Sequence, residues 1–213
     1  MKTRSALTVT FLVLICSTGL SQTLRLGLGG GPAFVQSGDN GYTRDIQNGG
    51  LAFNVAYALG GKAELSIPAS PISITGRVSY MFMRGSGVVK NPRLYYRDTG
   101  SVETRLHIWS VGLGGQWNVL SGPVAPYIGA QILLSSFSKL SFKQTNAGGT
   151  VEYLSGGATT VGMQIEVGSR FSMGRSVWLD VGANYSFHSP FSTYQMSGFS
   201  SLGFSAEVLF AVN

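Results

Sequence analysis

Apolar and polar residues alternate with a period of two along residues 159–187, on both sides of a short Ser-Met-Gly-Arg-Ser turn at 172–176. Successive side chains of a β-strand point to opposite faces of the sheet. The alternation therefore predicts an antiparallel hairpin with one apolar and one polar face. The apolar positions of the two arms are Val161, Met163, Ile165, Val167, Phe171, Val177, Leu179, Val181, Ala183, Tyr185 and Phe187.

The same alternation recurs along the chain and predicts eight strands. We expect them at residues 23–35, 51–67, 72–82, 109–119, 127–135, 161–171, 177–187 and 202–212. The second strand keeps its parity over seventeen residues, whereas strands of soluble domains have about five or six. A strand that crosses a bilayer needs about 9–11 residues, so this length favours membrane-spanning strands.

Connections between the expected strands alternate between long and short. The long ones cover 36–50, 84–104, 140–157 and 188–198, and the short ones cover 68–71, 121–123 and 172–176. Outer-membrane barrels have this asymmetry, because their periplasmic turns are short and their extracellular loops are long. The predicted fold is all-β, an eight-stranded antiparallel up-and-down transmembrane β-barrel with short periplasmic turns and long extracellular loops.

A soluble β-sandwich is the alternative to the barrel. In a sandwich the apolar face forms a core, whereas in a membrane barrel it meets lipid and the polar face fills the lumen. Aromatic residues near both ends of the apolar face favour lipid interfaces over a plain aromatic core. They are Phe53, Tyr80, Phe82, Trp109 and Phe187 towards the long loops, and Trp117, Phe171 and Phe210 towards the short turns.

Residues 1–21 have the pattern of a signal peptide that is cleaved. Lys2 and Arg4 precede a short apolar run, and the small residues Gly19 and Ser21 precede the expected cleavage site. We expect residues 22–213 to form a single outer-membrane β-barrel domain. A lipoprotein anchored through Cys16 is the alternative, but Ile15 stands where a small residue is expected.

Composition narrows the possible functions further. Charged residues make up 11% of the chain and glycine contributes 30 residues, which suits closely packed strands. Cleavage after Ser21 would remove Cys16, the one cysteine, and with it any disulfide or thiolate site. Without Lys2 and Arg4, the fifteen basic residues become thirteen against nine acidic ones. This small, scattered excess excludes a nucleic-acid-binding surface.

Charged residues on the inward face form a neutral set of four cations and four anions. A barrel of eight strands is just wide enough to be filled by side chains. Charges enclosed there must be paired, because burying an unpaired charge costs several kcal/mol. We therefore predict a lumen ion-pair network, without an open channel, formed by Arg25, Lys62, Glu64, Arg77, Glu166, Arg170, Asp180 and Glu207.

Two further features of the inward face accompany this network. Small residues are expected to make room for the long charged side chains, at Gly27, Gly29, Gly112, Gly114, Gly168 and Gly182. Four large residues also fall on the inward parity, Met81, Tyr127, Leu133 and Trp178. Either they cap the ends of the lumen, or a β-bulge reverses the register locally.

The signal sequence, the eight strands, the unequal connections and the last strand together resemble the small outer-membrane β-barrel family, a porin-type family that includes OmpX and the OmpA transmembrane domain. The last strand partly matches that family's assembly signal at Ser201, Gly203, Ala206 and Val208. The resemblance implies a protein of the outer membrane of a Gram-negative bacterium, folded by the barrel-assembly machinery and surrounded by outer-membrane lipid and lipopolysaccharide. Members act as adhesins, membrane stabilisers, small pores, lipid-modifying enzymes or subunits of larger complexes, and fold alone does not choose among these.

The expected function is that of a structural or interaction protein, adhesin-like or scaffold-like, which works through its extracellular loops. Side chains suited to contacts with envelope proteins or surface phosphates are Tyr42, Arg93, Tyr95, Tyr96, Arg97, Tyr153, Phe191 and Tyr194. Alternatives are an accessory barrel subunit of an envelope secretion or uptake complex, or a narrow diffusion pore.

An enzyme is the least favoured alternative. His188 and Ser189 resemble, loosely, the His-x-Ser of lipid A deacylases. Adjacent residues on a strand point to opposite faces, however, so they cannot cooperate there. We interpret His188 as a loop residue and His107 as an interfacial side chain. Glu64 and Glu166 are a weak carboxylate pair, because nearby cations would keep both ionised. No metal-ligand spacing or phosphate-binding loop occurs, so we expect no catalytic residues, cofactor or metal.

Overall fold

A computed structural model describes residues 23–37, 45–46, 50–90, 99–154, 157–188 and 199–212. The expected signal peptide, 1–21, lies outside these residues. Within the described residues, no helix combines the length and the apolar character needed to cross a membrane.

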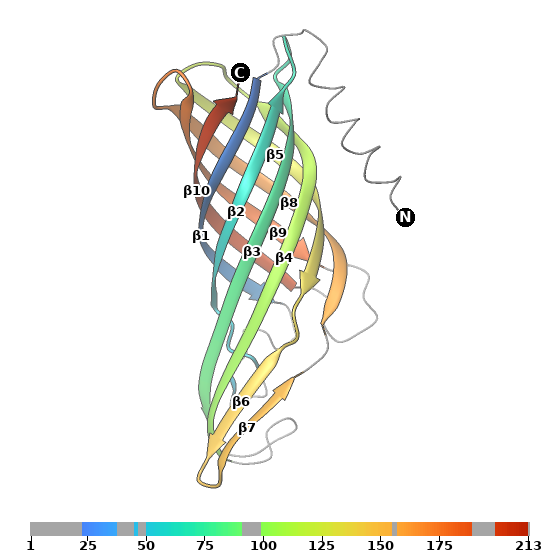
Figure 1. The fold of residues 1–213 in the computed structure, drawn as a ribbon, viewed down its shortest axis with the longest axis vertical. Coiled ribbons are helices and arrows are strands. Elements are labelled where there is room, and N and C mark those ends of the chain that lie inside the picture. Colours follow the sequence, from blue (N-terminus) through green and yellow to red (C-terminus); the bar gives the residue numbers. More distant parts are fainter. Residues whose placement is uncertain are drawn as a thin grey trace.

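The described residues form one antiparallel sheet that closes on itself (Figure 1). Eight of its ten strands make the ring, in chain order, because β3 pairs with β4 and β1 pairs with β10. The predicted eight-stranded up-and-down barrel is therefore confirmed. The ring strands are β1 (Thr23–Ser37), β2 (Val55–Ser66), β3 (Ile72–Val89), β4 (Gly100–Asn118), β5 (Val124–Phe137), β8 (Ala158–Ser172), β9 (Val177–His188) and β10 (Phe199–Val212).

All three short turns lie at one end of the barrel, as predicted. They connect β2 to β3, β4 to β5 and β8 to β9. We call this end the short-turn end and the opposite one the long-loop end.

The predicted loop at 84–104 is wrong at both of its ends, and residues 91–98 between them lie outside the described residues. β3 runs on to Val89 and β4 begins at Gly100, and the two strands stay in register up to the pair Val89↔Gly100. Charged residues made this stretch look like a loop. Arg84, Glu103 and Arg105 instead lie on the exposed outer face, where they pair with one another.

The predicted loop at 140–157 is also mostly strand. β6 (Ser141–Asn146) and β7 (Gly149–Leu154) form a hairpin whose turn holds the Asn-Ala-Gly-Gly sequence that favoured a loop. β6 pairs with the long-loop part of β4, from Ser101 to Arg105. The hairpin therefore extends the barrel wall beyond the ring, at the end away from the C-terminus (Figure 1).

The strand predicted at 51–67 is shorter than expected, because β2 begins at Val55. Ala52 has a φ of 54°, a left-handed conformation that interrupts the alternation. Phe53 is consequently fully buried inside the barrel. Its predicted place in the outer aromatic belt is wrong.

The two faces of the wall otherwise differ as the alternation predicts. Large apolar side chains are exposed on the outside of every ring strand, among them Leu28, Leu59, Val78, Leu113, Ile132, Met163, Val181 and Val208. Trp109, Trp117 and Phe210 are each more than half exposed on the same face. The register between β5 and its neighbours continues unbroken through Tyr127 and Leu133, so no bulge turns these two residues inward.

Candidate functional site

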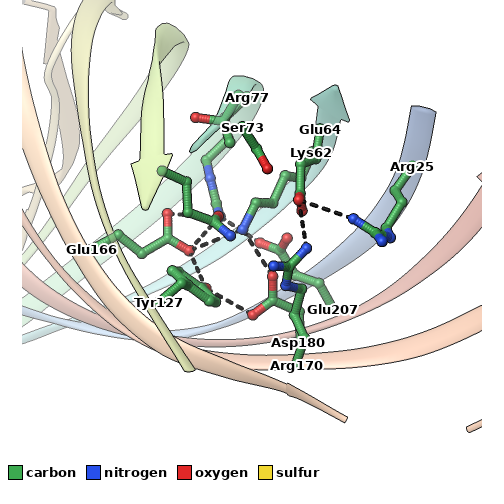
Figure 2. A network of polar contacts seen from close by, with 12 residues as sticks. Arg25, Lys62, Glu64, Ser73, Arg77, Tyr127, Glu166, Arg170, Asp180 and Glu207 are labelled. Atoms are coloured by element: carbon green, nitrogen blue, oxygen red, sulfur yellow. Dashed lines mark hydrogen bonds and ion pairs between the residues drawn. The ribbon is translucent and has the colours of Figure 1, made fainter. Parts of the chain in front are cut away.

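The eight charged residues predicted to fill the lumen lie inside the barrel, in its short-turn half. Seven ring strands supply the network and its bridging tyrosine: β1, β2, β3, β5, β8, β9 and β10 (Figure 2). The salt bridges divide them into two groups. The deep group comprises Lys62, Arg77, Glu166, Asp180 and Glu207, and the mouth group comprises Arg25, Glu64 and Arg170.

The deep group joins two cations to three carboxylates. Lys62 Nζ donates to Asp180 Oδ2 at 2.8 Å and lies 3.4 Å from Glu166 Oε1. Arg77 donates through Nη2 to both oxygens of Glu166, at 3.0 and 3.2 Å, and through Nη1 to Glu207. These side chains are almost fully buried. Pairing offsets the desolvation that burial imposes on each charge.

The mouth group joins two cations to one carboxylate. Arg25 Nη1 donates to Glu64 Oε1 at 3.1 Å and to Ser66 Oγ at 2.9 Å. Arg170 donates to the same Glu64 oxygen and to Asn118 Oδ1. The mouth group thus carries one excess positive charge and the deep group one excess negative charge.

Tyr127 contacts both the deep group and the mouth group. Its inward parity in the sequence did not predict these contacts. Its hydroxyl lies 2.7 Å from both Glu166 Oε1 and Asp180 Oδ1, so its proton can serve either carboxylate. Its ring lies 4.6 Å from Lys62 Nζ and 5.8 Å from the Arg170 guanidinium carbon. Both cations lie within about 6 Å of the ring centroid, the range in which cation–π attraction acts.

Gly168 and Gly182 make room for this tyrosine. A Cβ at Gly168 would lie 2.6 Å from the Tyr127 hydroxyl oxygen, and one at Gly182 would lie 3.0 Å from it. The other inward glycines pack against varied neighbours. Gly29 faces Glu207, whereas Gly27 faces Leu209 and Gly112 faces Gln131 and Leu133. The expected room for charged side chains thus applies to Gly29 and, beside Glu166, to Gly182. Gly114 instead lies against the backbone of Ala130 and Gln131.

An apolar layer closes the lumen at the long-loop end, which we did not predict from the sequence. Its buried residues are Ala33, Val35, Phe53, Ala56, Met83, Leu106, Ile108, Phe137 and Leu140. Met81 packs against this layer. Farther out, Ile46 packs with Val89 and Val102. The sequence did contain an indication of this layer, because apolar residues stand at inward positions of β3 and β4. The charged residues of the same stretch favoured a loop instead.

The search of protein families finds no matching family model, and the search of curated proteins finds no match. Solved structures do match. Neisserial surface protein A (NspA) aligns over 89% of this chain and 96% of its own, with 17% sequence identity and a TM-score of 0.51. The chain has the fold of the small outer-membrane β-barrels.

Two more solved structures are similar to this chain at lower scores. A major outer membrane protein from Thermus thermophilus covers 91% of this chain and all of its own, with 13% identity and a TM-score of 0.47. Ail, the attachment invasion locus protein of Yersinia pestis, covers 89% of this chain and 97% of its own, with 11% identity and a TM-score of 0.44.

His188 is placed differently from the prediction. It is the last residue of β9 rather than a loop residue, and its side chain points into the lumen at 2% exposure. Its Nδ1 lies 2.8 Å from Ser135 Oγ, which lies 2.8 Å from Ser110 Oγ. Ser189, the other half of the deacylase-like pair, lies outside the described residues. The adjoining cavity of about 50 Å³ has room for only a few waters.

His107 lies on the outer face of β4. Its Nδ1 shares a hydrogen bond with the Tyr80 hydroxyl, and its ring lies 5.1 Å from that of Phe82. Tyr80 also contacts Trp109, at 4.7 Å between ring centroids. These residues form one aromatic cluster at the level where the predicted belt lies.

Arg84 and Arg105 lie beyond this aromatic cluster, on the same outer face. Each donates a hydrogen bond to Glu103, at 3.0 and 3.1 Å. The bonds from Arg105 and Arg84 lower the pKa of the Glu103 carboxyl below its ordinary value. The three residues therefore form a charged surface with one excess positive charge.

Most predicted loop contacts lie outside the described residues: Tyr42, Arg93, Tyr95, Tyr96, Arg97, Phe191 and Tyr194. The backbone of Tyr153 belongs to β7 and pairs with Phe142, while its side chain lies outside the description. Within the described part of the chain, no group of three or more histidine, cysteine or acidic residues could hold a metal ion.

Proposed function

We propose that this chain is an integral outer-membrane β-barrel with a sealed lumen, which acts as a structural and interaction protein through its long-loop end. The outer face supports the membrane placement. It exposes branched aliphatic residues along all ring strands and aromatic residues towards both ends, the arrangement that lipid and its interfaces favour. Residues 1–21 would direct export, and the barrel-assembly machinery would insert the chain among outer-membrane lipid and lipopolysaccharide of a Gram-negative bacterium.

The observation that carries the proposal is the filling of the lumen by two different layers. The ion-pair network crosses the short-turn half, and the apolar layer crosses the long-loop half. A small cavity of about 50 Å³ lies between them. An ion would have to displace paired charges and then enter an apolar layer, and both steps are costly. Because the lumen is sealed, the two ends of the barrel are the surfaces available for function.

The long-loop end offers an extended surface for contacts. β3, β4, β6 and β7 run beyond the ring as a continuous sheet, in which Val88 and Val151 are exposed. A partner could add to the β7 edge, since this strand is paired on one side only within the described sheet. An adhesin-like or scaffold-like role would use this sheet together with the neighbouring loops.

Conductance in planar bilayers separates this proposal from a narrow pore. We expect the purified chain to insert without producing current steps, while a general porin inserted under the same conditions produces them. Reproducible steps that change in size with Arg77→Ala or Glu166→Ala would contradict a sealed lumen, because both residues belong to the deep group.

Site-specific crosslinking tests the interaction role. A photoreactive residue replaces Val151 on β7 in one variant and Val119, at the short-turn end, in the control; both positions are about half exposed. We expect crosslinks to other envelope or surface components from position 151 and none from position 119. Crosslinks from 119 alone would favour the alternative role, an accessory subunit that contacts a periplasmic complex.

A further inference from the structure

The short-turn mouth of the barrel contains a cavity of about 420 Å³. Ligand sites for small molecules begin at about 300 Å³, so this volume suits a small solute. Arg25, Arg170 and Trp178 line the cavity, together with Ser66, Ser70 and Ser121. Trp178 is one of the four large residues predicted to point inward, and it stacks under Arg25, whose guanidinium carbon lies 5.3 Å from the ring centroid.

The charge around this cavity is positive. The mouth group places Arg25 and Arg170 against Glu64 alone, and the turn residue Arg175 adds a further cation at the same end. Among the described residues of the three short turns, no acid offsets it. The compensating negative charge lies deeper, in the group of Lys62, Arg77 and their three carboxylates. Clefts with one sign of charge and low-dielectric walls concentrate counter-ions.

Each of the three side chains of the mouth group also has one polar atom without a partner among the described residues. Arg25 Nε, Arg170 Nε and Glu64 Oε2 are buried and make no hydrogen bond to any described residue. The Arg25 side chain is nevertheless 17% exposed, whereas that of Arg170 is 5% exposed. Of the two arginines that line the cavity, Arg25 is therefore the one that a solute entering from the short-turn end meets first.

We propose that this mouth binds a small oxyanion, a carboxylate or a phosphate group, between Arg25 and Arg170 and beside Trp178. Guanidinium groups bind both kinds of anion with charge-assisted hydrogen bonds. The serines that line the cavity add neutral hydroxyl donors. The site lies at the end opposite the proposed interaction surface and depends on the barrel fold alone, so its failure would leave the proposed function untouched.

Fluorescence quenching tests the positive mouth directly. In a Trp109→Phe/Trp117→Phe variant folded in uncharged detergent micelles, Trp178 is the remaining tryptophan. At low salt, with each quenching constant divided by that of free N-acetyltryptophanamide in the same micelles, we expect iodide to quench it at least about threefold more efficiently than caesium, because the mouth attracts anions. Arg25→Gln should remove most of this difference, and Arg25→Lys should keep it. Arg175→Gln is the matched control, since it removes a charge from the same end but does not line the cavity.

Binding of defined probes identifies the anion. Inorganic phosphate and succinate are titrated separately against Trp178 fluorescence, and we expect saturable changes with at least one of them. Arg25→Gln should weaken that binding about tenfold, the loss of one charge-assisted hydrogen bond, while Arg175→Gln leaves it unchanged. Equal normalised quenching by iodide and caesium would overturn the proposal. Probe binding that is absent, or that Arg25→Gln and Arg175→Gln weaken equally, would overturn it too.

Discussion

Lys62 on β2 and Asp180 on β9 lie 118 positions apart in the chain, yet Lys62 Nζ donates to Asp180 Oδ2 at 2.8 Å inside the lumen. Their strands are not neighbours in the sheet, because β1 and β10 stand between them. The bond therefore spans the interior of the closed ring. It exists only when the barrel is closed. Changes to the ion-pair network should therefore change the free energy of unfolding of the barrel.

Lys62→Met is expected to destabilise the barrel by about 3–5 kcal/mol, because Asp180 loses its cation while remaining buried. The free energy of unfolding in urea, measured in lipid vesicles, tests this value. Lys143→Met on the exposed face of β6 is the matched control and should change it little. A loss of similar size in both variants would show that burial of the charge is not the cause.

Tyr127→Phe is expected to cost about 1–3 kcal/mol, because it removes the hydroxyl shared by Glu166 and Asp180 and keeps the ring. The same unfolding experiment measures it. Tyr57→Phe serves as the control, since Tyr57 is 65% exposed on the outer face. If Tyr127→Phe had the same free energy of unfolding as the parent chain, the bridge between the two carboxylates would not stabilise the barrel.

Gly168→Ala is expected to destabilise the barrel by about 1–3 kcal/mol through overpacking. The added methyl would lie 2.6 Å from the Tyr127 hydroxyl oxygen and 2.7 Å from the Val181 carbonyl oxygen. At Gly76 the nearest atom to such a methyl is 3.9 Å away, so Gly76→Ala is the control. Combining Gly168→Ala with a smaller residue at Tyr127 should recover part of the loss if the clash is responsible.

Ile132→Arg tests whether the outer face meets lipid. Ile132 is 68% exposed in the middle of β5, and an arginine at the bilayer midplane costs about 2–4 kcal/mol. Val151→Arg, on the hairpin beyond the ring, should cost little in the same vesicles. If Ile132→Arg were equally harmless, the face would be solvated and the membrane placement wrong.

Much of the fold and part of the site followed from local pattern. Alternation alone placed strands at all eight ring positions, and it assigned Glu166, Arg170 and Asp180 to the inward face, because the parity of a strand is a local property. It also identified the three short turns. The errors fell at the long-loop end, where Arg84, Glu103 and Arg105 pair on the outside of a strand although charged stretches are more typical of loops.

Alternation of apolar and polar residues by itself thus determined that the wall is an antiparallel sheet with an apolar outer face. It also determined which side chains face inward. Which inward residues meet was decided only by the tertiary structure. Register and closure of the ring bring Tyr127 between two carboxylates, send His188 to Ser135 and stack Phe53 within an apolar layer. Each contact joins residues from different strands across a curved surface. Their proximity therefore depends on the closure and stagger of the whole barrel, and no short stretch of chain encodes it.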